Sequence, residues 1–145
     1  MVEEALTSGR AAEYFGRSVA AMGGPIDLME APQTYLKIAS KRPVFAEEQL
    51  IGQFVDRIDT RELGMAVVAL GGGRTSPNQS IDHAVGCSGF MIPGAQVNSE
   101  VPLAWVHARD DRSFDQASSR IKQAYGFNPE HSKQQGHMLL EHLKA

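Results

Sequence analysis

Apolar residues recur at the spacing of an amphipathic helix in three stretches of the chain. The first stretch starts at Arg10 and stops at Gly23-Gly24-Pro25, because glycine and proline terminate helices. Its apolar stripe consists of Ala11, Phe15, Val19 and Met22. Residues 2–6 have the pattern of the last turn of an earlier helix, and a short helical turn is expected over residues 27–30, before Pro32. The pattern predicts a helical N-terminal segment whose apolar face needs a partner.

The second helix is predicted to begin near Thr60. Asp59 and Glu62 have the spacing of a capping box, in which each carboxylate accepts a hydrogen bond from a backbone N–H at the helix start. The apolar positions surround so much of this helix that we expect it to be buried; they are Leu63, Met65, Ala66, Val67, Ala69 and Leu70. Gly71 follows directly and is well placed for the left-handed conformation that closes a helix.

The third helix is predicted from a second capping-box pattern, Ser113 with Gln116. Gly126 is expected to end it, and Pro129 stands just beyond. Its apolar stripe is Phe114, Ala117, Ile121 and Tyr125. This helix and the second one should cover a common sheet.

Shorter apolar runs between the helices predict the strands of that sheet. The runs are residues 44–46, 50–58, 81–87, 90–92 and 101–108. The first two are joined by the acidic turn Glu47-Glu48, and the last is apolar on both strand faces, as is typical of a covered strand. The order of elements predicts an α+β fold, a mixed or antiparallel sheet covered by helices.

The composition of the chain limits the classes of partner that it can bind. Of 145 residues, 42% are hydrophobic and 21% charged, which is ordinary for a soluble domain, and the net charge of −3 provides no basic surface for nucleic acid. No apolar run is long enough to span a bilayer, and the N-terminus lacks the pattern of a signal peptide. We therefore expect a cytoplasmic protein with no nucleic-acid or membrane partner. Cys87 is the single cysteine, interpreted as a small buried hydrophobe.

The histidines suggest no catalytic or metal-binding set. His83 follows Asp82, but neighbours on a strand point to opposite faces, and His107 is expected to be a hydrogen-bonded histidine within the sheet. Three more lie near the C-terminus: His131, His137 and His142. The last two are five apart, whereas helical ligand pairs use a spacing of four. We predict no catalytic residue, no metal ligand and no cofactor.

The run Gly71-Gly72-Gly73-Arg74 resembles a phosphate loop only superficially. A phosphate cradle needs glycines that lead into a helix N-terminus, whereas these glycines follow a helix C-terminus. We interpret Gly71, Gly72, Gly73 and Arg74 as a helix cap and the start of a lid loop that extends to Asp82. Arg74 is the local group that could attract an anion, and the alternative is an idle surface arginine.

Several blocks of the chain, taken in order, resemble the C-terminal part of bacterial thymidine phosphorylases, within the pyrimidine nucleoside phosphorylase family. They are residues 8–12, 21–30, 58–74, 81–86 and 102–108, and together they cover most of residues 8–108. Gly23-Gly24-Pro25-Ile26-Asp27 and Leu63-Gly64-Met65-Ala66-Val67-Val68 are highly specific in combination.

The resemblance implies a division of the chain into three parts. Residues 1–33 would belong to an upstream α/β domain, residues 34–128 would form an α/β-hammerhead-like C-terminal module, and residues 129–145 would be a polar tail of unknown role. The last residues, 130–145, are expected to be the least ordered. The chain is accordingly expected to be a fragment of a longer enzyme, with the upstream domains of the same polypeptide as its partners.

The resemblance also implies an activity. Thymidine phosphorylases convert thymidine and inorganic phosphate, the co-substrate, into thymine and 2-deoxy-α-D-ribose 1-phosphate. In the family the groups that hold phosphate and the pyrimidine lie in the preceding domains, and the complete enzyme is a homodimer. This chain is therefore expected to contribute structure and domain closure and to be inactive alone.

Other functions remain open on the sequence. A relative that acts on uridine or on a nucleoside monophosphate has the same C-terminal blocks, and a non-catalytic interaction domain is a further alternative. A biotinyl or lipoyl carrier module is disfavoured, because carriers need a lysine at a hairpin tip and no lysine occurs between Lys41 and Lys122.

Overall fold

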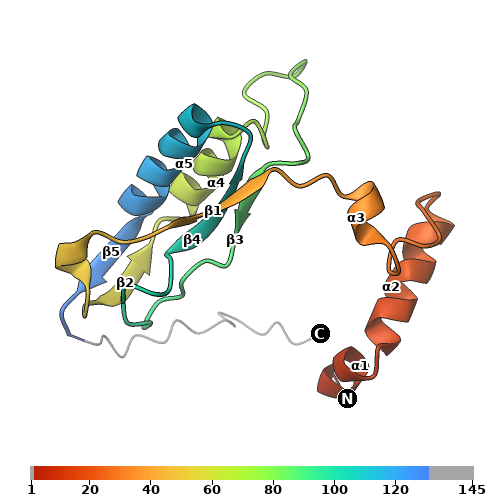
Figure 1. Cartoon of the computed structure of the whole chain (residues 1–145), viewed down its shortest axis with the longest axis horizontal. Coiled ribbons are helices and arrows are strands. Elements are labelled where there is room, and N and C mark those ends of the chain that lie inside the picture. Colours follow the sequence, from red (N-terminus) through yellow and green to blue (C-terminus); the bar gives the residue numbers. More distant parts are fainter. Residues whose placement is uncertain (1, 131–145) are drawn as a thin grey trace, which may run out of the picture. The chain divides into compact units, whose positions relative to one another are not determined.

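The computed structural model describes residues 2–130, and the chain divides into two compact units, Met1–Lys37 and Ile38–Ala145. The first unit is helical, with α1 (Val2–Thr7), α2 (Arg10–Ala21) and α3 (Pro32–Tyr35) (Figure 1). Helix α2 confirms the first predicted stripe. Residues 27–30 form a single turn, in which the N–H groups of Glu30 and Ala31 donate to the Asp27 carbonyl at 3.1 and 3.0 Å, but not a longer helix. Helix α3 starts after it, at Pro32, because proline lacks the N–H that a first helical position leaves unbonded.

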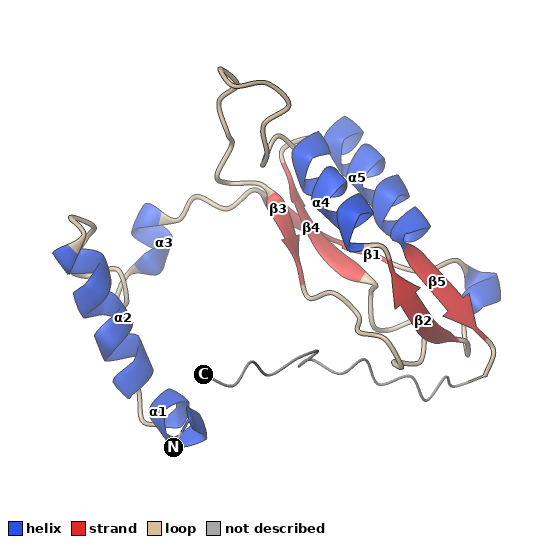
Figure 2. Cartoon of the chain, turned by 180° about the vertical axis from the view of Figure 1, so that it is seen from behind, coloured by secondary structure: helices blue, strands red, loops and turns tan. Residues whose placement is uncertain are grey.

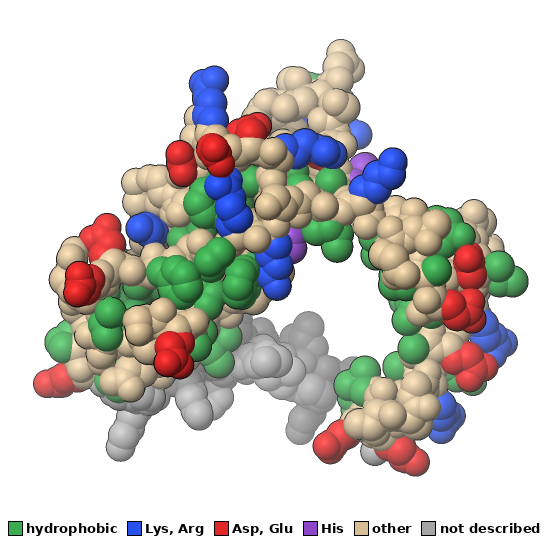
Figure 3. Space-filling model, viewed as in Figure 1, with side chains coloured by type: hydrophobic (Ala, Val, Ile, Leu, Met, Phe, Trp, Pro, Cys, Tyr) green, Lys and Arg blue, Asp and Glu red, His purple; other side chains and the backbone are tan. Residues whose placement is uncertain are grey.

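Large apolar side chains of the first unit reach its surface, as the space-filling view shows (Figure 3). No residue of α1, α2 or α3 is buried. Val2, Met22 and Ile26 are 77%, 80% and 85% exposed. Exposed apolar side chains at this density are typical of a surface that packs against other protein.

The described part of the second unit, residues 38–130, contains five strands and two α-helices. They are β1 (Ser40–Val44), β2 (Phe54–Ile58), α4 (Thr60–Ala69), β3 (Gly86–Ser88), β4 (Ala104–Ala108), α5 (Asp111–Ala124) and β5 (Tyr125–Asn128), with a short 3₁₀ helix at Glu48–Leu50. The strands form two antiparallel sheets, one ordered β1-β4-β3 and the other pairing β2 with β5 (Figure 2). The predicted α+β class is confirmed.

Apart from β1 and the unpredicted β5, the strands are shorter than the apolar runs suggested. The run at 81–87 contributes only β3, and residues 90–92 form no strand, although Met91 donates a hydrogen bond to the Leu103 carbonyl at 2.8 Å. Strand β1 lies earlier than expected and includes Pro43. Proline is tolerated there because β1 is an edge strand.

The core lies between the β1-β4-β3 sheet and α5. Every second residue of β4 is buried, namely Ala104, Val106 and Ala108. Helix α5 contributes Ala117 and Ile121 to the same interior, and its Ala124 is buried as well. The other face of β4 carries Trp105 and His107, which are only half-buried, so the expectation of a strand covered on both faces was wrong.

Helices α4 and α5 lie side by side (Figures 1 and 2). Asp59 caps α4 as predicted, accepting hydrogen bonds from the backbone N–H groups of Arg61 and Glu62 at 3.0 and 3.2 Å. The Glu62 carboxylate does not return to the cap; it accepts from Arg120 of α5 at 2.9 Å. The pattern therefore gave the helix start correctly but assigned Glu62 the wrong partner.

Burial of α4 is less complete than expected. Within the helix only Ala66 is buried, and Met65 is 37% exposed. The helix packs mainly against α5, and Arg61, Gly64 and Met65 remain exposed. The expectation of a buried helix was therefore wrong for the described part of the chain.

Helix α5 starts earlier and ends earlier than predicted. Its cap is Asp110, whose carboxylate accepts from the Ser113 N–H at 2.7 Å, so Ser113 lies inside the helix rather than at its cap. Tyr125, expected on the helical stripe, begins β5 instead. The Tyr125 hydroxyl is 3.0 Å from the carbonyl oxygens of both Met91 and Leu103, which fixes this residue in the core.

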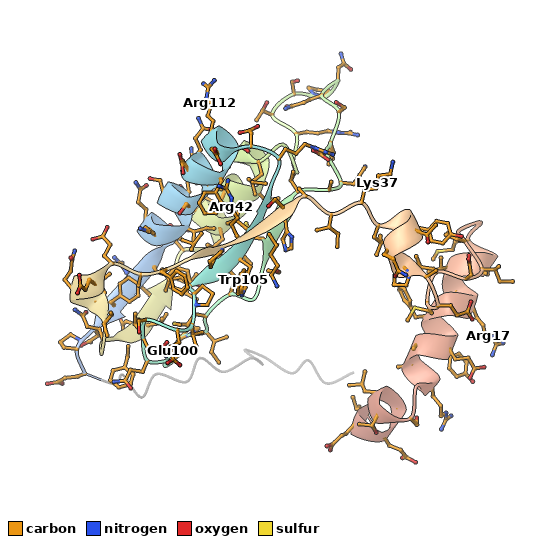
Figure 4. All side chains as sticks on the ribbon, viewed as in Figure 1. Arg17, Lys37, Arg42, Glu100, Trp105 and Arg112 are labelled. Carbon is orange, nitrogen blue, oxygen red and sulfur yellow. The ribbon has the colours of Figure 1, made fainter. Side chains whose placement is uncertain are left out.

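An arginine joins the edge of the sheet to the start of α5. Arg42, on β1 and labelled in Figure 4, donates to the Asp111 carboxylate at 2.8 Å. Its guanidinium carbon also lies 3.8 Å from the centre of the Phe114 ring. This cation–π contact holds the first turn of α5 against β1.

Candidate functional site

The chain leaves α4 through a glycine cap. Gly71 has a φ of 92°, the left-handed conformation predicted for it. The N–H groups of Gly71 and Gly72 donate to the carbonyls of Val68 and Val67 at 2.9 and 3.0 Å. These amides are therefore used to close the helix and do not form an anion cradle, in agreement with the interpretation of the glycine run as a cap.

Gly72 and Gly73 are needed for close packing. A Cβ atom at Gly72 would lie 2.9 Å from a methyl group of Val67, and one at Gly73 would lie 2.6 Å from a methyl group of Val68. Both distances are too short for real contacts, so only glycine lets the chain fold back on α4. The exposed part of the loop therefore begins at Arg74 rather than at the first glycine.

The tip of the loop projects beyond the ends of α4 and β3, drawn in light green in Figure 1. Arg74 is exposed and forms no ion pair within residues 2–130. Beyond it, the Gln79 side-chain oxygen accepts from both the N–H and the hydroxyl of Thr75, at 2.8 and 2.7 Å. The tip thus carries a free guanidinium next to a turn that is held by its own hydrogen bonds.

Asp82 closes the base of the loop. Its N–H donates to the Gly71 carbonyl at 2.9 Å, which joins the two ends of the loop. Its carboxylate accepts from the Ala84 N–H at 3.0 Å and from two nitrogens of Arg109, with Nη2 to Oδ1 at 2.9 Å and Nε to Oδ2 as the second contact. Asp82 therefore connects the end of α4, the entry to β3 and the end of β4.

The Arg109 hydrogen bond, followed by that of Ala84, lowers the pKa of Asp82 from 3.8 to about 2. Because the pKa in the folded chain is lower than the ordinary value, this group favours the folded loop above its ordinary pKa, and the contribution is lost as the pH falls toward 2. The sequence gave no signal of the Asp82–Arg109 pair, since 27 positions separate the two residues. Only the meeting of the β3 entry with the end of β4 brings them together.

The open face of the β1-β4-β3 sheet carries polar side chains from all three strands. The Ser88 hydroxyl lies 3.0 Å from His107 Nε2, which confirms His107 as a hydrogen-bonded histidine within the sheet. The ammonium of Lys41 lies 4.4 Å from the centre of the Trp105 ring, and Trp105 is labelled in Figure 4. Cys87 lies on the other face of β3 and packs against the core, where burial raises the pKa of its thiol to about 11, so the thiol stays protonated at neutral pH.

Metal chemistry has no support in the part of the chain that the structure describes. No three histidine, cysteine or acidic side chains gather there in a way that could hold an ion. The predictions for His131, His137 and His142 and for the ordering of the tail fall outside the described residues. No helix of residues 2–130 is long and apolar enough to cross a membrane.

A comparison of the sequence with models of known protein families agrees with this architecture. The family model of the pyrimidine nucleoside phosphorylase C-terminal domain matches residues 54–128, from the first residue of β2 to the last of β5. The chain belongs to this family, whose members are phosphorylases that act as pentosyltransferases. The match includes the glycine cap, the loop and the Asp82–Arg109 pair.

Proposed function

We propose that this chain is the C-terminal part of a thymidine phosphorylase and that it serves domain closure rather than chemistry. The membership of residues 54–128 in the phosphorylase family supports the reaction class. The blocks at residues 21–30 and 58–74, which resemble thymidine phosphorylases, support thymidine as the nucleoside. The reaction is attack of inorganic phosphate on the sugar carbon that bears thymine, with release of the base, and it takes no further cofactor.

The proposed partners are the upstream domains of the same polypeptide and, in the complete enzyme, a second copy. The supporting observation is the exposed apolar surface of residues 2–37, with Met22 and Ile26 at 80% and 85% exposure. A surface of this kind marks a site of contact with other protein, because burial of its apolar side chains is favourable. The α/β-hammerhead arrangement of the second unit, and a boundary near residue 33 between it and the upstream domain, belong to the same proposal.

The loop from Gly71 to Asp82 is proposed as the closing element, and Arg74 as the residue that holds the closed state. The observation that carries this role is an exposed guanidinium with no ion pair in residues 2–130, on a loop that projects from a fixed base. In a closed cleft Arg74 would meet a carboxylate or the phosphate co-substrate. A charge-assisted hydrogen bond of this kind is strengthened when water is excluded.

A direct assay tests the non-catalytic role. The isolated 145-residue chain, incubated with thymidine and phosphate, is expected to release no thymine above a protein-free blank, because the resemblance places the groups that hold phosphate and the pyrimidine in the preceding domains. Thymine release that scales with protein concentration would contradict the proposal. Uridine, assayed in parallel in the complete enzyme, should be cleaved more slowly than thymidine, and a preference for uridine would overturn the proposed specificity.

A further inference from the structure

The loop from Gly71 to Asp82 has a narrow neck and a broad exposed tip. The neck is a single backbone hydrogen bond of 2.9 Å between the Asp82 N–H and the Gly71 carbonyl. Compact loops whose ends meet in this way are Ω-loops, and they keep their shape through contacts of their own side chains. At the tip that contact is the pair of hydrogen bonds from Thr75 to Gln79.

Only at the neck do side chains of this loop bond to a distant part of the chain, within residues 2–130. The Thr75–Gln79 bonds are internal to the loop, and Arg74 pairs with no acidic group there. Asp82, in contrast, reaches the end of β4 through two contacts with Arg109. A bidentate pair fixes the relative orientation of the two side chains as well as their distance, because the planar guanidinium and the carboxylate must lie in one plane to form both hydrogen bonds.

We propose that Asp82 and Arg109 form a clamp that fixes the neck of this loop, and that Arg109 is a positioning residue which presents Arg74 for domain closure. The proposal rests on the proposed function of the loop and adds the residue that makes the loop effective. With the clamp in place, the tip swings as one body about the neck. Without it, the neck depends on one backbone bond, the tip samples more conformations, and closure must order them at an entropic cost.

Simple stabilisation of the corner between β4 and α5 is the competing explanation for the pair. Arg109 is 61% exposed in its side chain, so the pair contributes little to global stability. If the pair stabilised this corner, its loss would speed the hydrogen exchange of amides in β4 and α5 as well as in the loop. If the pair is a clamp, its loss would speed exchange in the loop alone. This difference distinguishes the two explanations.

Amide hydrogen exchange of the 145-residue chain tests the clamp. In Arg109→Gln the hydrogen-bonded loop amides of Thr75, Gln79 and Asp82 are expected to exchange about threefold to fivefold faster, the factor that an exposed ion pair can supply. In Asp82→Asn the exchange rate should rise about tenfold. The substitution removes the ion pair and also replaces the carboxylate that accepts from the Ala84 N–H by an amide oxygen, which accepts a weaker hydrogen bond. Arg109→Lys should restore only part of the protection, since an ammonium cannot pair with both carboxylate oxygens in the same plane.

Arg61→Gln is the matched control, because Arg61 is an exposed arginine whose side chain forms no ion pair within the described residues. Its loop amides should exchange at the wild-type rate. Loop exchange in Arg109→Gln equal to that of the control, or an equal rise throughout β4 and α5, would overturn the clamp.

Kinetics separate this proposal from the function on which it rests. In the complete enzyme, Arg109→Gln should raise the KM with little change in kcat, and Arg109→Lys should recover part of the loss. Faster loop exchange combined with unchanged kinetics of Arg74→Ala would support the clamp and contradict the closure role. Unchanged exchange combined with altered kinetics of Arg74→Ala would contradict the clamp alone.

Discussion

Ile121→Ala is expected to lower the free energy of unfolding by about 2–5 kcal/mol, as large-to-small changes in a packed interior do. Ile121 is 0% exposed and lies on α5, where the helix packs against the sheet and against α4. The lost methyl and methylene groups remove apolar burial and leave a cavity that the rigid layers around it cannot fill. Urea denaturation, followed by far-UV circular dichroism, measures the change.

Lys122→Ala provides the control, because Lys122 is the next residue of the same helix and is exposed. It should change the free energy of unfolding by less than about 0.5 kcal/mol. If Ile121→Ala were equally mild, α5 would not be the element that closes the core, and the described packing would be wrong.

Tyr125→Phe is expected to lower the free energy of unfolding by about 1–3 kcal/mol, because it leaves buried carbonyl groups without their donor. The Tyr125 hydroxyl lies 3.0 Å from the carbonyl oxygens of Met91 and Leu103. The Leu103 carbonyl retains the N–H of Met91 at 2.8 Å, so the loss should fall mainly on the Met91 carbonyl. Burial raises the pKa of Tyr125 to about 12, so the hydroxyl remains a donor well above neutral pH.

Thermal or urea unfolding measures this loss, with Tyr14→Phe as the control. Tyr14 is 57% exposed on α2, so removal of its hydroxyl should have almost no effect. Equal effects of the two substitutions would mean that the Tyr125 hydroxyl is satisfied by solvent and does not join the 90–103 segment to the sheet.

The sequence predicted the helices better than the sheets because a helix is specified by neighbours. Asp59 and Gly71 mark the start and the end of α4 through local hydrogen bonds, and both positions were predicted correctly. Strand β5 was missed because Tyr125 also fits the helical stripe of α5. Only the pairing with β2, in which Tyr125 lies opposite Ile58, selects the extended conformation.

The candidate site was predictable only in part for the same reason. The lid residues Gly71, Gly72, Gly73 and Arg74 could be named from the sequence, since a glycine run after a helix has a local meaning, and their role in closure stays a prediction. The structure adds that two of the glycines are required by their contacts with Val67 and Val68. The Asp82–Arg109 pair could not be foreseen, because it depends on a tertiary contact between two segments that carry no motif for it.

The kinetics of Arg74→Ala in the complete phosphorylase test the central claim most directly. The exposed guanidinium forms no ion pair within residues 2–130, so the melting temperature should be nearly unchanged. Loss of one charge-assisted hydrogen bond in the closed state should lower kcat/KM about tenfold, through a higher KM or a lower kcat, and Arg74→Lys should recover part of it. Unaltered kinetics, or a large fall in melting temperature instead, would contradict the closure role of this domain.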